Sequence, residues 1–176
     1  MRKSDFVTIF RIFLVFVSFA LLYFNNLWGL ILIPIAFFLD SVDGFLARRE
    51  EEKEYGKRLD VAGDRITEYF YYLLFTVKGL IPIFVFPIII TRNSLVDTFF
   101  YTPKKNFSTT KTALARFFSS SRFSRFLYGF LKAVTFFYLG SVLLFSFPII
   151  FGYILVAIIV IFSVIRGTAD ILESFS

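Results

Sequence analysis

The sequence predicts an all-α, polytopic membrane protein with six transmembrane helices and both termini in the cytoplasm. Composition is the first reason, because 57% of the 176 residues are hydrophobic and 28 are phenylalanine, whereas a soluble domain is roughly 45–50% apolar. The second reason is a series of long uncharged stretches, which are typical of helices that cross a bilayer. The third is that basic residues gather in alternate connections between these stretches.

We expect helices over residues 6–25, 28–48, 58–77, 80–101, 126–146 and 148–172. The uncharged windows that support them are Ile12–Phe24, Leu27–Leu39, Leu80–Ile90 and Val142–Ile165, the last of which includes a turn. Short turns are expected at Asn25-Asn26, Lys78-Gly79 and Phe147-Pro148. The third helix begins with charged residues, so its first turns should face protein or water. A single domain is expected to cover residues 1–176.

Charge patterning predicts the orientation in the membrane. The amino terminus and the two longer connections, residues 48–58 and 102–125, carry most of the lysines and arginines. By the positive-inside rule they lie in the cytoplasm, which predicts a site that faces the cytoplasm from the cell membrane. The first segment follows Met1-Arg2-Lys3 without a small-residue cleavage site, so we expect a retained helix. Residues 113–125 fit either a basic amphipathic helix at the interface or a substrate contact.

Missing residue types limit the chemistry. The chain has no cysteine and no histidine, which excludes disulfides, thiol catalysis, thiolate zinc sites and imidazole bases. A general base must therefore be a carboxylate, a lysine or a tyrosine.

Four aspartates stand at the cytoplasmic ends of two predicted helices. Asp40 and Asp43 are three residues apart near the end of the second helix, and Asp60 and Asp64 are four apart at the start of the third. These spacings place each pair on one helical face, and the two helices are consecutive and antiparallel. Four converging carboxylates need cations between them, and Mg²⁺ or Mn²⁺ are the expected partners. Two such ions side by side suit displacement at phosphorus.

Small residues and an arginine accompany the aspartates. Gly44 and Gly56 leave room for a planar ligand near the backbone, Ala47 keeps the same face small, and Arg48 offers a planar fork suited to a phosphate. The simpler alternative is that the aspartates only stabilise helix ends or pair with nearby cations. Two facing pairs with glycines between them favour a binding site.

Residues 40–64 read DSVDGFLARREEEKEYGKRLDVAGD. This stretch resembles the signature of the CDP-alcohol phosphatidyltransferase family, D-x-x-D-G-x-x-A-R, usually eight residues, then G-x-x-x-D-x-x-x-D. All eight specified positions match, and the one difference is a gap of seven residues between Arg48 and Gly56. A loop tolerates such a difference best. With the six-helix layout, the resemblance extends over most of the chain.

The resemblance implies an integral-membrane transferase that moves a phosphatidyl-type group from a CDP-linked lipid to an alcohol and releases CMP. It implies two Mg²⁺ or Mn²⁺ ions on Asp40, Asp43, Asp60 and Asp64, with Asp64 also the base for the acceptor hydroxyl. It implies a nucleotide site at Thr8, Gly44, Ala47, Arg48 and Gly56. It further suggests a homodimer among membrane lipids; no nucleic-acid partner is expected.

The start of the chain departs from the family pattern. Family members often show Pro-Asn and then Leu-Thr-x-x-Arg before the first span. Here SDFVTIFR keeps Thr8 and Arg11 but has Asp5 in place of the asparagine. We expect Thr8 and Arg11 to help seat the donor. The simpler interpretation makes Thr8 a helix-start residue and Arg11 a cation that snorkels to the interface.

A phosphorylated acceptor requires cations near the site. The expected ones are Arg92, Lys111, Arg116, Arg122 and Arg125. Arg92 is the strongest, because an arginine within a span is costly unless it has a function. Its simpler role is snorkelling or pairing with Asp97, and the simpler role of the others is positive-inside charge.

The identity of the acceptor rests on two local signals that disagree. An arginine in the fourth helix followed by Lys111-Thr112 resembles the glycerophosphate-using members, whereas Arg65-Ile66-Thr67-Glu68 is closer to the inositol-phosphate-using members. We favour glycerol phosphate, with inositol phosphate next. The alternatives are an unphosphorylated acceptor such as serine, a divalent-ion carrier whose aspartates line a permeation site, and an inactive relative.

Overall fold

The computed structural model describes residues 3–47, 54–100 and 122–175, and within these ranges the chain is helical without a strand. The helices are α1 (Lys3–Tyr23), α2 (Leu27–Ala47), α3 (Glu54–Val77), α4 (Val85–Phe100), α6 (Arg122–Phe145) and α7 (Ile149–Phe175). Six helices in the predicted order are therefore confirmed. The predicted amphipathic segment at 113–121 lies outside the described residues.

Helices α1, α3 and α6 begin three or four residues before their predicted starts, at Lys3, Glu54 and Arg122, and α4 begins five residues after its own. Helix α3 begins at Glu54 rather than at residue 58, so Gly56 is a helical residue. Helix α4 begins at Val85 rather than at residue 80, because Gly79 adopts a φ of 70° and Pro82 has no N–H to donate. The N–H of Val85 donates to the carbonyl of Pro82 at 3.1 Å, which forms the start of α4.

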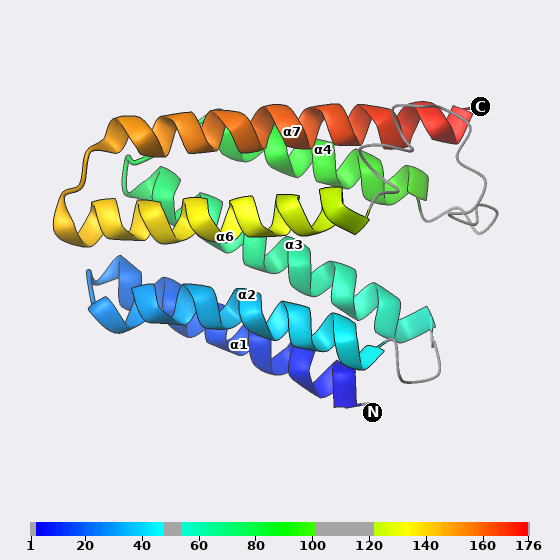
Figure 1. Cartoon of the computed structure of the whole chain (residues 1–176), viewed down its shortest axis with the longest axis horizontal. Helices are drawn as coiled ribbons and strands as arrows, with labels where there is room; N and C mark the ends of the chain where they lie inside the picture. Colours follow the sequence, from blue (N-terminus) through cyan, green and yellow to red (C-terminus); the bar gives the residue numbers. More distant parts are fainter. Residues whose placement is uncertain (1–2, 48–53, 101–121, 176) are drawn as a thin grey trace.

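The turns between consecutive helices are tight. After α1, Asn25 adopts a φ of 56°, a left-handed conformation that asparagine tolerates. The N–H groups of Asn25 and Asn26 donate to the carbonyls of Leu22 and Leu21 at 2.9 and 2.8 Å, which satisfies the last carbonyls of the helix. Figure 1 shows the three tight turns at one end of the bundle, and the start of α1 and the end of α7 at the other.

The bundle has two halves. Helix α1 packs against α2 and α3, and α7 packs against α4 and α6 (Figure 1). Aromatic residues join the halves, because Phe136 of α6 lies among Tyr71, Tyr72 and Phe75 of α3, with ring centroids 5.2, 5.0 and 6.2 Å apart. All four of these side chains are fully buried. Their tilted and edge-on contacts add to the stability that burial alone provides.

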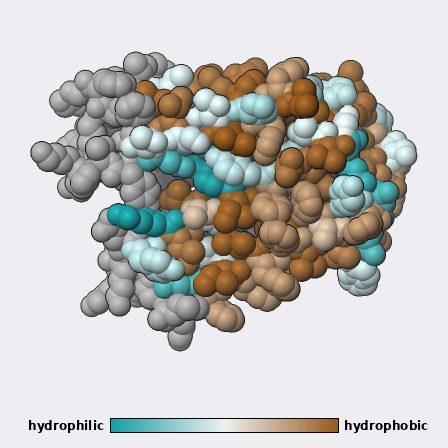
Figure 2. Space-filling view, turned by 180° about the vertical axis from the view of Figure 1, so that it is seen from behind, coloured by the Kyte–Doolittle hydropathy of each residue, from teal (hydrophilic) through white to brown (hydrophobic). Residues whose placement is uncertain are grey.

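In the part of the chain that the structure describes, three helical segments are long and apolar enough to cross a membrane: Ser4–Tyr23, Phe126–Phe145 and Ile149–Ala169. A shorter apolar stretch, Leu27–Val42, ends where the aspartates begin. Hydrophobic residues cover most of the middle of the face in Figure 2, and hydrophilic residues gather toward its ends. The chain thus has the character of an integral membrane protein, and the six-span topology stays a prediction.

The two first helices touch through a glycine. A Cβ added to Gly29 of α2 would lie 2.7 Å from the backbone nitrogen of Leu22 and 2.9 Å from the carbonyl oxygen of Ser18. The hydroxyl of Ser18 donates to the Gly29 carbonyl at 2.8 Å and accepts a hydrogen bond from Tyr71 of α3 at 3.1 Å. Close backbone contact at a small residue is a common way to pack membrane helices.

We therefore expect Gly29→Ala to push α1 and α2 apart and to destabilise the protein by about 1–3 kcal/mol, the usual cost of overpacking. The matched control is Gly129→Ala in α6, where an added Cβ meets nothing within 4 Å; its stability should stay within about 1 kcal/mol of the wild type. Thermal unfolding in detergent measures both. Equal stability of the two variants would contradict the close α1–α2 contact.

Candidate active site

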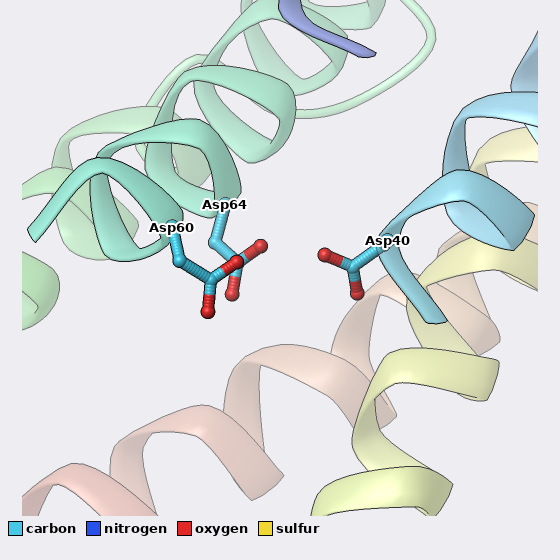
Figure 3. Close-up of side chains that lie close together, drawn as sticks. All are labelled: Asp40, Asp60 and Asp64. Carbon is cyan, nitrogen blue, oxygen red and sulfur yellow. The ribbon is translucent and has the colours of Figure 1, made fainter. Parts of the chain in front are cut away.

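Three aspartates meet between the end of α2 and the start of α3. One carboxylate oxygen each from Asp40, Asp60 and Asp64 lies within 4.8 Å of the others. Figure 3 shows Asp40 facing Asp60 and Asp64 across the gap between the two helices. The side chains are 40%, 46% and 45% exposed, so a ligand can reach them from solvent. The predicted meeting of these three carboxylates is confirmed.

Local sequence explains the arrangement. Asp60 and Asp64 are one helical turn apart on α3, and Asp40 lies near the end of the antiparallel α2, so their Cβ atoms face one another. Asp43 and Gly44 follow within α2, but their side-chain environment is not among the described features, and Arg48 lies outside the described residues. Gly56 is buried one turn before Asp60.

A buried arginine lies against all three carboxylates. Nη1 of Arg11 contacts Oδ1 of Asp40 and lies 3.0 Å from Oδ1 of Asp64, and Nη2 lies 3.8 Å from Oδ1 of Asp60. The Arg11 side chain is only 1% exposed. The snorkelling interpretation of Arg11 is therefore wrong: the residue turns inward because the carboxylates offset its charge better than the bilayer surface would.

A glycine of α3 makes room for this arginine. A Cβ added to Gly63 would lie 2.6 Å from Nη2 of Arg11 and 2.8 Å from Cγ2 of Thr8. Thr8 is buried beside it, and its hydroxyl donates to the carbonyl of Ser4 at 3.2 Å. Thr8 and Arg11 thus lie next to the aspartates as a pair one turn apart, and the role of Thr8 toward a nucleotide stays a prediction.

A second polar cluster lies one turn farther along α3. Glu68 is 1% exposed and accepts hydrogen bonds from Nδ2 of Asn93 on α4 at 3.1 Å and from the hydroxyl of Tyr128 on α6 at 3.2 Å. The Nζ of Lys132 lies 3.8 Å from the same carboxylate. Glu68 therefore links three helices from both halves of the bundle.

Sequence reasoning assigned no role to Glu68. Its spacing of four residues from Asp64 and its place before an apolar run were the available signals, since an ionisable residue inside a span is a functional hypothesis by default. What could not be read from the sequence is which side chains of α4 and α6 face it.

Two arginines near this cluster bind different partners. Arg65 donates twice to Asp97, from Nε at 2.9 Å and from Nη2 at 2.7 Å. Arg92 instead donates to the carbonyl of Ser163 and to Oδ1 of Asn93, each at 2.9 Å. The simpler expectation that Arg92 pairs with Asp97 is wrong, because the planar fork of Arg65 already holds that carboxylate.

Arg92 reaches α7 through a second glycine. A Cβ on Gly167 would lie 2.5 Å from Nε of Arg92. Of the other cations predicted for the acceptor, Lys111 and Arg116 lie outside the described residues. Arg122 and Arg125 belong to the first turn of α6, and their side chains are not described.

The triad suits a hard divalent ion. It offers three carboxylate oxygens and no nitrogen or sulfur ligand, which is the donor set that Mg²⁺ and Mn²⁺ prefer. Open access to solvent leaves positions for the oxygens of a substrate. The arrangement can therefore bind an anionic, phosphate-bearing group through a shared cation and place a carboxylate beside it.

Comparison with known proteins gives the family. The model of the CDP-alcohol phosphatidyltransferase family matches residues 1–165, which is most of the chain and includes both clusters. The chain belongs to this family. It is accordingly an enzyme that transfers substituted phosphate groups, and the family in general depends on divalent metal ions. A search of curated proteins finds no match to the chain.

Proposed function

We propose that this CDP-alcohol phosphatidyltransferase moves a phosphatidyl-type group from a CDP-linked lipid to a phosphorylated polyol, glycerol phosphate ahead of inositol phosphate, and releases CMP. The observation that carries the proposal is the meeting of Asp40, Asp60 and Asp64, three aspartates of the family signature, within 4.8 Å. In this proposal they hold Mg²⁺ or Mn²⁺ together with Asp43. The bound ions would neutralise the diphosphate and the departing CMP.

The chain's own residues would then serve the two ends of the reaction. The acceptor hydroxyl forms a bond to the phosphorus that carries the lipid, the bond from that phosphorus to the CMP oxygen breaks, and Asp64 takes the hydroxyl proton. A carboxylate base is consistent with the absence of histidine. Asp64 is half-exposed, so an acceptor can approach it. Thr8, Gly44, Ala47, Arg48 and Gly56 are proposed to form the nucleotide site.

Three cations support a phosphorylated acceptor. Lys132 lies 4.4 Å from the ring centroid of Tyr128 and Arg166 lies 5.6 Å from it, while Arg92 is close enough to that tyrosine to affect it electrostatically. The two hydrogen-bond acceptors described for Arg92, a carbonyl and an amide oxygen, are neutral. Lys132 is already paired with Glu68, so the cation proposed to meet the acceptor phosphate is Arg92, which is linked through Asn93 to Glu68, one helical turn from Asp64.

We also propose that all six helices span the cell membrane with the aspartates at the cytoplasmic side. The start of α1 and the end of α7 lie at one end of the bundle (Figure 1), which agrees with an even number of spans. The ends of α2 and α4 and the starts of α3 and α6, which flank the basic connections in the sequence, lie at that same end (Figure 1), which agrees with the positive-inside rule. The homodimer implied by the resemblance stays a prediction.

The direct test is CMP release by purified protein with a CDP-linked lipid, Mn²⁺ or Mg²⁺, and a panel of acceptors. We expect release with glycerol phosphate or inositol phosphate, and about 10²–10⁴-fold slower turnover in Asp64→Asn because the base is lost. Donor binding should persist in that variant. The control is Asp97→Asn, which makes the same substitution at a carboxylate that Arg65 binds. This variant should change the thermal stability of the protein. Release only with serine, or unchanged turnover in Asp64→Asn, would contradict the proposal.

The acceptor site predicts a selective effect of Arg92→Gln. Losing a charged hydrogen bond to the acceptor phosphate should raise its KM by about 10–100-fold with a smaller change in kcat. The control is Lys78→Gln, which removes one positive charge at the turn after α3, where Nζ lies 3.4 Å from Asn25 Oδ1. This variant should leave the KM for the acceptor unchanged. Steady-state kinetics at saturating donor separates the two. Equal KM values in wild type and Arg92→Gln would remove Arg92 from the acceptor site.

A further inference from the structure

Arg11 has contacts that the proposed reaction does not require. Its guanidinium is 1% exposed, and Nε and Nη2 have no hydrogen-bond partner among the described residues. An arginine stays protonated inside a protein, and a buried charge is costly unless it is paired. The compensation that the structure shows for this charge comes from the carboxylates of Asp40, Asp64 and Asp60.

The same carboxylates need Arg11 in return. Three ionised carboxylates whose oxygens lie within 4.8 Å of one another repel strongly. One guanidinium reduces the charge of this group from −3 to −2, counted from three aspartates and one arginine. Arg11 is the cation whose contacts with all three carboxylates the structure describes. Arg11 therefore acts on the aspartates as a cation that belongs to the chain.

A divalent ion would be held by the same carboxylates. Asp40 and Asp64 both face Nη1 of Arg11, so an ion held by them would meet a positive charge beside its ligands. Nη2 of Arg11 fills the space that Gly63 leaves at the α1–α3 contact. The guanidinium therefore has little room to move away from the carboxylates. Binding of the ion must therefore weaken the contacts of Arg11 or be weakened by them.

We propose that Arg11 is an internal counter-cation that competes with the divalent ion for the carboxylates of Asp40 and Asp64. It stabilises the cluster when no metal is bound and lowers the affinity of the cluster for metal. This inference rests on the proposed metal site, but it concerns binding alone. It can be tested without donor, acceptor or turnover, so a failure of the transfer reaction would not affect its result.

The experiment compares full-length wild type and Arg11→Gln in detergent. In EDTA, Arg11→Gln should unfold at a lower temperature because the carboxylates lose their counter-cation. In Mn²⁺ titrations followed by calorimetry or by the EPR signal of free Mn²⁺, it should bind about tenfold more tightly, since a unit charge next to the ligands is gone. Mn²⁺ should also raise its unfolding temperature more than that of the wild type.

Two further variants keep the result decisive. Lys78→Gln removes one positive charge at the turn end of the bundle, where Nζ lies 3.4 Å from Asn25 Oδ1, and its Mn²⁺ affinity should change by no more than about twofold because solvent and salt screen distant charges. Arg11→Lys keeps the charge and should fold in EDTA, but one ammonium cannot contact Asp40 and Asp64 with one nitrogen and Asp60 with a second, as Nη1 and Nη2 of Arg11 do. Its Mn²⁺ affinity should rise by less than that of Arg11→Gln.

An unchanged or weaker Mn²⁺ affinity in folded Arg11→Gln would overturn the proposal and would indicate that Arg11 serves the donor or the metal-bound form instead. If Arg11→Gln does not fold in EDTA but folds in Mn²⁺, the metal has replaced the missing cation, which supports the proposal. If it folds in neither, Arg11→Lys decides. A Mn²⁺ affinity of Arg11→Lys equal to or below that of wild type would overturn the proposal.

Discussion

The contact of three carboxylates with one buried guanidinium is the interaction on which the packing of α1, α2 and α3 depends. Asp40, Asp60 and Asp64 come from two helices, and Arg11 comes from a third. Arg11 can offset part of the charge of the aspartates only if α1 lies directly against α3, and Gly63 allows this because it has no side chain. Farther along α1, Gly29 of α2 permits a similarly close contact with Ser18 and Leu22. The packing of the first three helices therefore depends on the residues that form the site.

The second half of the bundle is tied to the first by Glu68. This residue is buried, and it binds Asn93 of α4 and Tyr128 of α6 while it sits one turn from Asp64. Burying a carboxylate with its partners is weak evidence for stability, because desolvation costs about as much as the pairing returns. Glu68 instead positions neighbouring side chains. It contacts Lys132 directly and Arg92 through Asn93, and so holds both near the proposed base. A shift of either half would move Lys132 and Arg92 relative to Asp64.

Much of this arrangement can be predicted from the sequence, and the reasons for the failures are physical. Six helices and the meeting of Asp40, Asp60 and Asp64 follow from apolar windows, tight turns and spacings of one helical turn, which are local features. The inward turn of Arg11 and the Arg65–Asp97 pair depend on how helices distant in sequence are rotated about their axes. That rotation is set by the packing of many side chains. The start of α4 lies five residues later than predicted for a local reason, because Gly79 adopts a positive φ and Pro82 has no N–H to donate.

We propose above that the three aspartates share a divalent ion. Anomalous diffraction from crystals grown with Mn²⁺ tests it most directly, because the signal marks the ion itself. We expect an anomalous-difference peak between the end of α2 and the start of α3, about 2.0–2.2 Å from carboxylate oxygens, as is usual for a small divalent ion. We also expect that the peak disappears in Asp60→Asn. Mn²⁺ bound elsewhere, or an unoccupied triad at saturating Mn²⁺, would contradict the proposal.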